Sequence, residues 1–414
     1  MLRGTEWSRF DDLCAGTAWL FPAIKTSLVA WQHHEVPAVL AEVEKATADG
    51  RWAWGFVSYE AASGLDPTLL AHPPIDGLPL AWFGITVAPL PAPALRTGPH
   101  RDYTAGPWGC DWPRATHRSR VAAVRARIAE GETYQCNLTT RLRTDLRGDA
   151  QDFYSTIALG QQGAYNAYLD LGRYVIASAS PELFFELHAD RLTMRPMKGT
   201  AARGLTDAED AVIRAQLQAS PKERAENIMI VDLIRNDLAR LATIGSVSVS
   251  SLCTAERYET VHQLTSTVTA RLRPDLGLVD IFRALFPCGS VTGAPKCNTM
   301  RMIRHLEDDA RGVYCGAIGV IAPPDHRFRA RFSVAIRTAL IDRDTSSAVY
   351  GSGGAITWSS DPDDEYDELL TKARVLHGWQ HKAPEDSRAR VSTGDSSANM
   401  PVSQGRRRSG ARPA

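Results

Sequence analysis

Lys198 is the residue of this sequence with the widest choice of chemistry. It lies between an apolar approach and a Gly-Thr turn, within the stretch 195–204. Glycine beside a reactive group often marks a place where the backbone comes close to another group, because glycine has no Cβ. A lysine there can bind an anion as a point charge, or act as a nucleophile when it is desolvated and neutral. The alternative is an ordinary surface lysine in a turn, and this stretch alone does not decide.

Two pairs of glutamates repeat one spacing in segments with helical patterns. Glu223 and Glu226 lie three residues apart after Pro221, a residue type that commonly begins a helix. Glu365 and Glu368 repeat the spacing, so each pair falls on one helix face. Such carboxylates often do no more than solvate a helix or complement the dipole at its start. If the two helices converge, the four carboxylates form a hard, oxygen-rich site of the kind that Mg²⁺ takes.

A further group of residues is suited to holding carboxylates. Arg337 closes a strand pattern, and Tyr314 precedes it in the sequence. Gly353 and Gly354 belong to a glycine-rich stretch of the next strand region, and Lys372 follows in the last helical segment. Exposed backbone N–H groups at a glycine turn, together with Arg and Lys, suit carboxylate oxygens. A glycine-rich bulge or turn that binds nothing is the alternative.

Two side chains are candidates for moving protons. Glu182 follows a proline and precedes a Leu-Phe-Phe run. Apolar surroundings raise the pKa of a carboxyl group, so Glu182 is suited to act as a general acid near neutral pH. His262 lies in a strand pattern, where it is either a core histidine or a second acid–base group.

The composition predicts a soluble, cytoplasmic protein. The chain has 414 residues, of which 44% are hydrophobic, and its zero formal net charge indicates neither nucleic acid nor an acidic membrane as a partner. Its seven cysteines contain no C-x-x-C pair, which argues against a disulfide framework or a zinc site and for a reducing compartment. No apolar run approaches the ~18 residues of a membrane-spanning helix, and we expect no secretory signal at the N-terminus.

The elements that must position these residues are a mixture of helices and strands. Helix patterns cover 35–48, 117–131, 206–241 with a break at Pro221, 278–285, 296–307 and 363–380. Strand patterns cover 53–59, 79–87, 134–142, 169–178, 246–250, 257–263, 312–322, 329–341 and 347–358. Hairpin-like connections favour an α+β fold with largely antiparallel sheets over a doubly wound parallel sheet. No G-x-G-x-x-G or Walker A string indicates NAD or ATP.

The sequence predicts four regions along the chain. Residues 1–90 form an N-terminal subregion that packs on the core, and residues 91–112 form a Pro-rich connector. Residues 113–381 form the catalytic core. Residues 382–414 are rich in Ser, Arg, Gly and Pro without an aromatic residue, so we expect a disordered tail.

Six stretches, in this order and spacing, resemble the chorismate-utilising enzymes between about residues 110 and 378. They are Tyr134-Gln-Cys-Asn-Leu, Ser180-Pro-Glu-Leu-Phe, Pro196-Met-Lys-Gly-Thr, Lys222-Glu-Arg-Ala-Glu-Asn, Gly293-Ala-Pro-Lys and Asp367-Glu-Leu-Leu-Thr-Lys-Ala-Arg. The match in order is far more specific than any single motif.

The resemblance implies an α+β fold in which large antiparallel sheets, flanked by helices, surround a deep active-site cleft. It implies that Glu226 and Glu368 bind Mg²⁺, which holds the ring carboxylate of chorismate, while Glu223 and Glu365 hold metal-bound waters. The implied ligands of the enolpyruvyl carboxylate are Tyr314, Arg337 and the backbone of Gly353 and Gly354. The remaining implied contacts are Lys372, Gly199 and Thr200 along the substrate and His262 near the ring end.

Two positions separate the activities within the family. Members that make anthranilate usually carry Ala at the position of Lys198, and members that add water place a lysine base at the position of Gln135. The resemblance therefore implies amination of chorismate at C4 on the route to p-aminobenzoate, with Lys198 as the nucleophile and Glu182 as the acid. No glutaminase region is evident in the sequence, so a separate glutamine amidotransferase subunit would supply ammonia.

Two alternatives stay open at this stage. One is amination at C2, which gives anthranilate or 2-amino-2-deoxyisochorismate, and Lys198 argues against it. The other is a non-catalytic chorismate-binding scaffold. Ala355 keeps the scaffold alternative open, because it stands where the family often has a third glycine after Gly353 and Gly354.

Overall fold

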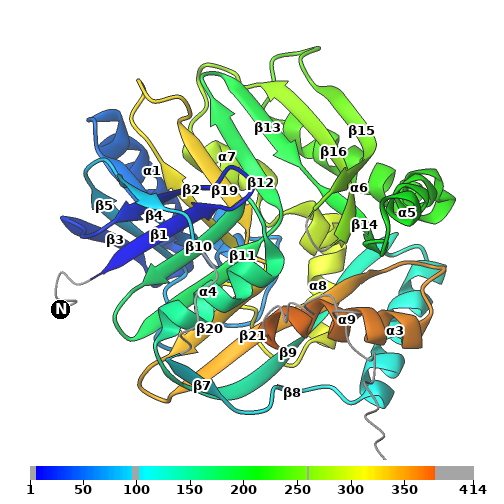
Figure 1. Ribbon diagram of the computed structural model, residues 1–414. Helices are drawn as coiled ribbons and strands as arrows, with labels where there is room; N and C mark the ends of the chain where they lie inside the picture. Colours follow the sequence, from blue (N-terminus) through cyan, green and yellow to red (C-terminus); the bar gives the residue numbers. More distant parts are fainter. Residues whose placement is uncertain (1–5, 96–101, 259–260, 378–414) are drawn as a thin grey trace, which may run out of the picture. The chain divides into compact units, whose positions relative to one another are not determined.

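Two antiparallel sheets carry the candidate residues in the computed structural model, which describes residues 6–95, 102–258 and 261–377 (Figure 1). The predicted tail 382–414 and part of the predicted connector 91–112 lie outside these residues. Residues 6–90 contribute strands to both sheets rather than a sheet of their own. The division of the chain into four regions stays a prediction.

The first sheet has eleven strands in the described part of the chain, and its main path runs β17-β9-β21-β20-β11-β10-β1-β2-β6. Its strands are β1 (Trp7–Asp12), β2 (Thr17–Phe21), β6 (Leu90–Pro93), β7 (Tyr103–Ala105), β8 (Gly109–Cys110), β9 (Gln135–Gly148), β10 (Tyr165–Asp170), β11 (Tyr174–Ser180), β17 (Gly293–Ala294), β20 (Thr338–Asp342) and β21 (Ser347–Ile356). The long pair β9 and β21 carries the Gly353 and Gly354 stretch.

The second sheet has ten strands in the same described residues, and its main path runs β14-β16-β13-β12-β19-β18-β4-β5-β3, with β15 paired to β16. Its strands are β3 (Thr26–Ala30), β4 (Trp52–Val57), β5 (Ala81–Thr86), β12 (Leu183–His188), β13 (Arg191–Arg195), β14 (Met197–Ala202), β15 (Ser248–Arg257), β16 (Val261–Arg271), β18 (Ala317–Ile321) and β19 (Ala330–Val334). Lys198 lies on β14, the last strand of this path.

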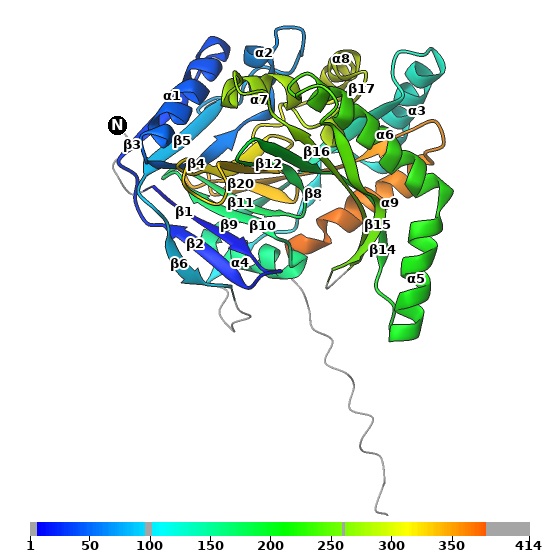
Figure 2. The same cartoon turned by 90° about the horizontal axis from the view of Figure 1, so that it is seen from above.

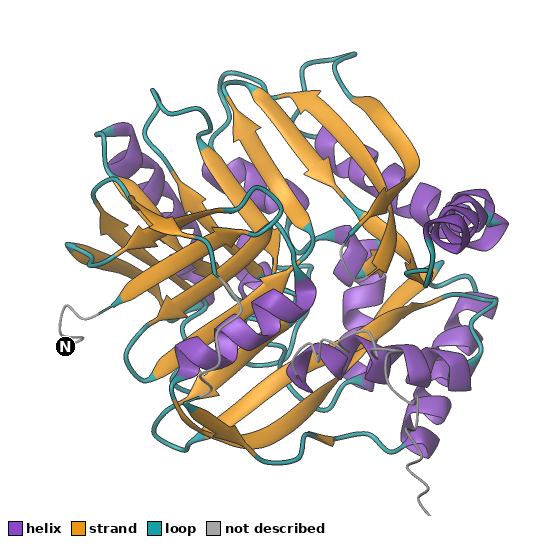
Figure 3. Ribbon diagram, in the orientation of Figure 1, coloured by secondary structure: helices purple, strands orange, loops and turns teal. Residues whose placement is uncertain are grey.

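Helices accompany both sheets (Figures 2 and 3). The α-helices are α1 (Val36–Ala48), α2 (Ala62–Leu65), α3 (Arg114–Ala129), α4 (Ala150–Gln161), α5 (Asp207–Ala219), α6 (Pro221–Ala239), α7 (Leu278–Leu285), α8 (Lys296–Leu306) and α9 (Pro362–Lys372). Short 3₁₀ helices are η1 (His33–Glu35), η2 (Tyr59–Ala61), η3 (Gly289–Val291) and η4 (Ala373–His377). Within the described ranges, none of these helices combines the length and the apolar character needed to cross a membrane.

The strands β4 and β5 show why the sheets pack as they do. Every residue of both strands is buried, as the continuous apolar sequence of each strand predicts for a strand covered on two faces. Trp54 and Trp82 belong to a cluster that also holds Leu169 and Ile176 of the first sheet. On the other face, Ala53 and other side chains join a second cluster with residues of α1 and α7. The predicted α+β class with antiparallel sheets is confirmed.

Three of the predicted strands are wrong in detail. The predicted strand 257–263 joins the end of β15 at Arg257 to the start of β16 at Val261. The apolar run 169–178 is a hairpin rather than one strand, because the chain turns at Gly172 with a positive φ of 84° between β10 and β11. The Asp170 carboxylate accepts a hydrogen bond of 3.0 Å from the Gly172 N–H and closes this turn. Arg337 lies between β19 and β20 with a φ of 53°, so it occupies a turn and not a strand.

Candidate active site

A β-bulge sets the direction of Lys198. In the pair β14 and β16, Met197 lies opposite Thr265 and Thr200 opposite Gln263, so Lys198 and Gly199 together face the single residue Leu264. The extra residue of a bulge changes the face to which a side chain points. A Cβ built on Gly199 would lie 2.8 Å from Oε2 of Glu223 and 3.2 Å from Cβ of Leu264. The bulge therefore faces helix α6.

Lys198 is partly buried and lies within electrostatic range of four carboxylates. Burial raises the pKa of Glu182 to about 7 and raises the pKa of Glu223 and Glu226, and the positive charge of Lys198 opposes each rise. Its charge also contributes to the lowered pKa of Glu368. The nucleophile candidate, the acid candidate and both glutamate pairs thus belong to one region.

The two glutamate pairs converge, although they come from helices far apart in the sequence. Burial is the main cause of the raised pKa of Glu223, Glu226 and Glu365, and the neighbouring carboxylates add to it across the two helices. Glu368 is half exposed and forms an ion pair of 2.7 Å with Lys372, which holds its pKa below the usual range. Helices α6 and α9 therefore face each other with an excess of negative charge.

The four glutamate carboxylates of α6 and α9 fit a divalent cation in charge and donor type. Their oxygens are nevertheless too far apart in this structure to coordinate one ion together. Among the described residues, no three His, Cys, Asp or Glu side chains are close enough to hold one ion. Carboxylate oxygens are the preferred ligands of hard cations such as Mg²⁺. Lys372 occupies Oε1 of Glu368, so a metal ion at that oxygen would compete with the ammonium group.

The residues predicted to hold an anion lie at the α9 end of this region. Lys372 donates a hydrogen bond of 2.8 Å from Nζ to the Gly353 carbonyl oxygen. A Cβ built on Gly354 would lie 3.0 Å from Oε2 of Glu365 and 3.6 Å from Nζ of Lys372, so a larger residue would crowd both side chains. Arg337 donates from Nη1 to the carbonyl oxygen of Lys372. The left-handed turn at Arg337 is what brings its guanidinium to α9.

Tyr314 lies beside the same strand but is tightly packed. A Cβ on Gly351 would lie 2.2 Å from Cδ1 of the Tyr314 ring, so only glycine leaves room for the ring there. Tyr314 is buried, and burial raises the pKa of its phenol well above the usual range. The guanidinium of Arg141 lies 5.4 Å from the ring centre. Tyr314 therefore stays neutral and packs against Gly351, at the start of the glycine-rich stretch of β21.

Glu182 is almost completely buried at the start of β12. Its Oε1 has no hydrogen-bond partner among the described residues. The nearby Ser290 hydroxyl, which donates to Cys288 Sγ at 3.3 Å, partly opposes the rise in the pKa of Glu182 that burial causes. The sequence did not reveal Ser290 as a neighbour of this acid, although Ser290 lies in the conspicuous loop 286–296. A buried carboxyl oxygen without a partner is costly, so this atom is available to a ligand.

His262, Gln135 and Thr200 are not joined to this group by hydrogen bonds within the described residues. His262 is fully buried, and its Nε2 lies 2.8 Å from Oδ1 of Asp210 on α5. Both amide atoms of Gln135 are buried without a hydrogen-bond partner in the described part of the chain. Thr200 is exposed. Asp210 is a partner that the sequence did not reveal, because its contact depends on how α5 packs.

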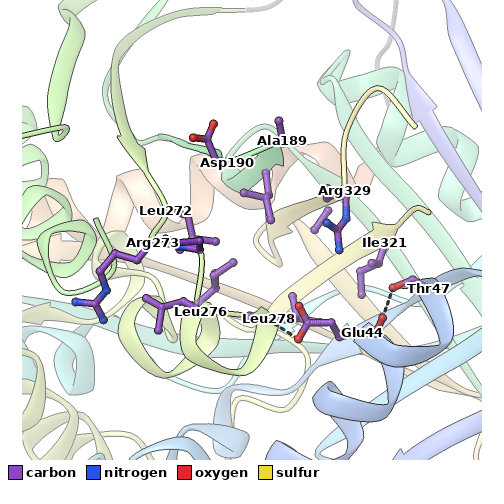
Figure 4. A pocket seen from close by; sticks show the side chains of 15 residues that line it. Glu44, Thr47, Ala189, Asp190, Leu272, Arg273, Leu276, Leu278, Ile321 and Arg329 are labelled. Atoms are coloured by element: carbon purple, nitrogen blue, oxygen red, sulfur yellow. Dashed lines mark hydrogen bonds between the residues drawn. The ribbon is translucent and has the colours of Figure 1, made fainter. Parts of the chain in front are cut away.

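A pocket elsewhere on the chain contains none of the predicted site residues (Figure 4). It has a volume of about 170 Å³ and is lined by α1, α7 and the strand ends near Ala189 and Arg329. Glu44 accepts a hydrogen bond of 3.0 Å from the Leu278 N–H at the start of α7. The charged side chains that line this pocket carry both signs, and they form no cluster suited to catalysis. The region around Lys198 is therefore the better candidate for the active site.

Replacing Gly199 with alanine is expected to reduce turnover by about 10²-fold, because a displacement of about 1 Å at a reacting group has that effect. The φ of Gly199 is +89°, and the new Cβ would press on Glu223 and Leu264. The strain should also cost roughly 1–2 kcal/mol in the free energy of unfolding. Gly131→Ala is the matched control, because Gly131 has a φ of +78° with nothing within 4 Å. Equal activity losses in the two variants, measured by steady-state kinetics, would contradict this role of Gly199.

Comparison with known proteins gives consistent findings. A family model described as chorismate binding enzyme matches residues 86–378. Aminodeoxychorismate synthase of Streptomyces pristinaespiralis is 44% identical over 260 residues, which are 63% of this chain and 36% of that protein. Aminodeoxychorismate synthase component 1 of Klebsiella aerogenes is 35% identical over 72% of this chain and 63% of that protein. Anthranilate synthase component 1 of Aquifex aeolicus is 34% identical over 65% of this chain and 53% of that protein.

Solved structures share the fold. Anthranilate synthase component I of Streptococcus pneumoniae superposes with a TM-score of 0.72 and 24% identity, covering 89% of each chain. The menaquinone-specific isochorismate synthase of Escherichia coli gives a TM-score of 0.69 at 17% identity, covering 90% of this chain and 88% of that one. The match to this chain thus spans about a third to two thirds of the curated relatives and most of the solved ones.

Proposed function

Because the chain belongs to the family of chorismate binding enzymes, we propose that it catalyses the amination of chorismate at C4 to 4-amino-4-deoxychorismate. The observation that carries this proposal is the position of Lys198, on a bulge that faces α6 and within range of Glu182 and the glutamate pairs. Relatives with the printed name aminodeoxychorismate synthase occur in both bacteria and plants, which supports the same reaction here.

Chorismate carries two carboxylates. One would meet basic side chains of this chain, and the other would meet a cation held by the glutamate pairs. Lys372, Arg337 and the backbone of Gly353 and Gly354 would bind the enolpyruvyl carboxylate through charge-assisted hydrogen bonds, with Tyr314 beside them. Glu226 and Glu368 would hold a divalent cation, with Glu223 and Glu365 around its waters. The family depends on a metal ion, and we propose Mg²⁺, which would offset the charge of the ring carboxylate.

The chemistry needs an acid and a nucleophile, because the 4-hydroxyl of chorismate is a poor leaving group. Glu182 donates its proton to the hydroxyl oxygen, which leaves as water. Lys198, in its neutral form, forms a bond from Nζ to C2 while both ring double bonds shift and the C4–O bond breaks. Ammonia then adds at C4, both double bonds shift back, and the C2–N bond to Lys198 breaks, which returns the neutral lysine. Gly199 and Thr200 would line the substrate, and we propose Gln135 and His262 as the residues nearest its ring.

Ammonia would come from a glutamine amidotransferase partner. Relatives of this chain carry the printed designation component 1, which implies a second component for those proteins. The match covers 36% of the Streptomyces relative, so further functions of that longer protein are not carried over to this chain. We therefore propose that the isolated chain uses free ammonia and that a partner chain makes glutamine usable.

Product analysis tests the proposal directly. The purified chain is incubated with chorismate, Mg²⁺ and ammonium, and the products are separated by liquid chromatography with mass detection. We expect 4-amino-4-deoxychorismate as the main product and none without ammonium. Anthranilate or salicylate as the main product would overturn the proposal, and so would unchanged chorismate in the presence of every reactant.

Anthranilate formation is the second candidate. The 34% identity to anthranilate synthase component 1 of Aquifex aeolicus favours it, since the two activities share substrate and fold. The position of Lys198 argues against it, because amination at C2 requires that position to be free of a competing nucleophile.

The turnover number is expected to fall as the pH rises above about 7. Burial raises the pKa of Glu182 to about 7, so its carboxyl group is protonated and able to act as an acid below that value. Each further unit of pH should lower the protonated fraction about tenfold. The check is a pH–rate profile at saturating chorismate, with the rate corrected for the concentration of free NH₃. Glu182→Gln should be much slower and lack this decline, and a wild-type rate that rises through pH 8 would contradict the assignment.

A further inference from the structure

The strand β16 pairs regularly with β13, but its pairings with β14 and β15 each contain a bulge. On the β14 side, Lys198 and Gly199 lie opposite Leu264. On the β15 side, the register shifts between Ser251 and Thr254, where Cys253 adopts a positive φ of 52°. A bulge interrupts the regular ladder, so backbone groups near it need other partners.

The side chain of Asn227, on α6, supplies partners on both sides. Its Nδ2 donates a hydrogen bond of 3.2 Å to the Leu264 carbonyl oxygen, opposite the Lys198 bulge. Its Oδ1 accepts from the Ser266 hydroxyl at 2.5 Å and from the Cys253 thiol at 3.6 Å. The Ser266 hydroxyl oxygen in turn accepts from the Cys253 N–H at 2.9 Å. Asn227 is fully buried, so no water competes for these bonds.

Asn227 lies on the same helix as Glu223 and Glu226, so its hydrogen bonds also bear on where these two carboxylates lie. Asn227 directly follows Glu226 and lies one helical turn beyond Glu223. Figure 1 shows α6 next to β14, β15 and β16. Because Gly199 already lies against Glu223, a small shift or rotation of α6 would change the distance between the carboxylates and the Lys198 bulge.

We propose that Asn227 is a positioning residue, which sets the α6 carboxylates in register with the Lys198 bulge by bonding the backbone opposite that bulge. It touches no substrate itself. In this role Asn227 holds Glu226 and Glu223 at the distance from Lys198 that the reaction needs. The inference therefore rests on the proposed function. Residues that orient metal-binding side chains typically change metal affinity about 10- to 100-fold when they are replaced.

The test compares Asn227→Ala with Asn298→Ala, which changes an exposed asparagine on α8 that only approaches the Glu132 carbonyl at 3.5 Å. Mn²⁺ binding to the folded chain is measured by electron paramagnetic resonance, and ammonia-dependent kinetics give kcat and KM separately. We expect Asn227→Ala to weaken Mn²⁺ binding about tenfold and to lower kcat more than it changes the KM for chorismate. Asn298→Ala should match the wild type in both.

Ser266→Ala keeps the bond from Asn227 to Leu264 and serves if Asn227→Ala fails to fold. Ser266→Ala should also weaken Mn²⁺ binding, but less than Asn227→Ala does. The effects of the two substitutions should not add in the double variant, because both act on one contact. Folded variants with wild-type Mn²⁺ affinity and kcat would overturn the inference and leave Asn227 a packing residue. A wild-type chain that binds no Mn²⁺, or whose binding is unaffected by Glu226→Gln, would instead overturn the proposed metal site.

Discussion

Replacing Lys198 with alanine should remove the formation of 4-amino-4-deoxychorismate, with a loss on the order of 10³-fold or more, because the reaction loses its nucleophile. The folded state should be little affected, since the side chain is partly exposed and its loss creates no buried cavity. Amination at C2 becomes open once the lysine no longer occupies that carbon, so a trace of C2-aminated product is consistent with this role. The measurement is product analysis under single and multiple turnover.

Two further variants separate nucleophilic attack from a purely electrostatic role. Lys198→Arg keeps the positive charge but cannot act as the amine nucleophile, so it should be as inactive as the alanine variant. Lys222→Ala removes a neighbouring charge that acts on Glu223, Glu226 and Glu368 but does not lie on the bulge, and it should retain most activity. An active Lys198→Arg enzyme would show that Lys198 acts through its charge alone.

Replacing Arg311 with leucine should destabilise the chain by about 3–5 kcal/mol, because it leaves a buried carboxylate without its main partner. The Arg311 guanidinium donates to Glu307 at 2.6 and 3.0 Å and to the carbonyl oxygens of Val291 and Asn137 at 2.7 and 2.8 Å. Both charged side chains of the pair are at most 2% exposed. The free energy of unfolding in urea, followed by circular dichroism, measures the effect.

The control for Arg311 is an exposed pair. Arg127 bonds Glu130 and Glu132 at 3.0 and 2.9 Å, but all three side chains are about half exposed, so Arg127→Leu should change stability far less than Arg311→Leu. Removing both members of the buried pair, in Arg311→Leu with Glu307→Leu, should cost less than removing Arg311 alone, because no charge is left uncompensated. A double variant as unstable as the sum of its parts would contradict this account.

The Arg311 pair also joins the N-terminal residues to the rest of the chain. The backbone N–H groups of Arg311 and Gly312 donate to the Glu60 carboxylate at 2.7 and 2.9 Å. Burial nevertheless raises the pKa of Glu60 to about 7. Tyr59 places its ring 4.5 Å below the Arg311 guanidinium. Residues 59 and 60 are therefore part of the packing behind Tyr314, and not a separate module.

Much of the candidate site was predictable because its signals are local. The i, i+3 spacing of Glu223 and Glu226, and of Glu365 and Glu368, needs only a helix to place each pair on one face, and both helices are present. The apolar neighbours of Glu182 predicted a raised pKa, and burial raises it to about 7. The α+β class followed from the order of short strands and helices, and the structure confirms it.

The rest depends on contacts between residues that are distant in sequence. The direction of Lys198 is decided by a bulge whose partner strand lies more than sixty residues further along the chain. Arg337 reads as a strand residue, yet a left-handed turn carries its guanidinium to α9. No local pattern reveals that Asn227 bonds Leu264 and Ser266, since nothing in the periodicity of α6 marks its partner.

The sequence by itself determined which groups are available: a lysine beside glycine, two glutamate pairs, a buried acid and a set of anion-binding residues. Only the tertiary structure decided that the carboxylates of α6 and α9 lie within electrostatic range of one another and of Lys198, and that His262 pairs with Asp210. The physical reason is that residue type and spacing act within a few residues, whereas strand register and helix packing are set by side chains that meet only after the whole chain has folded.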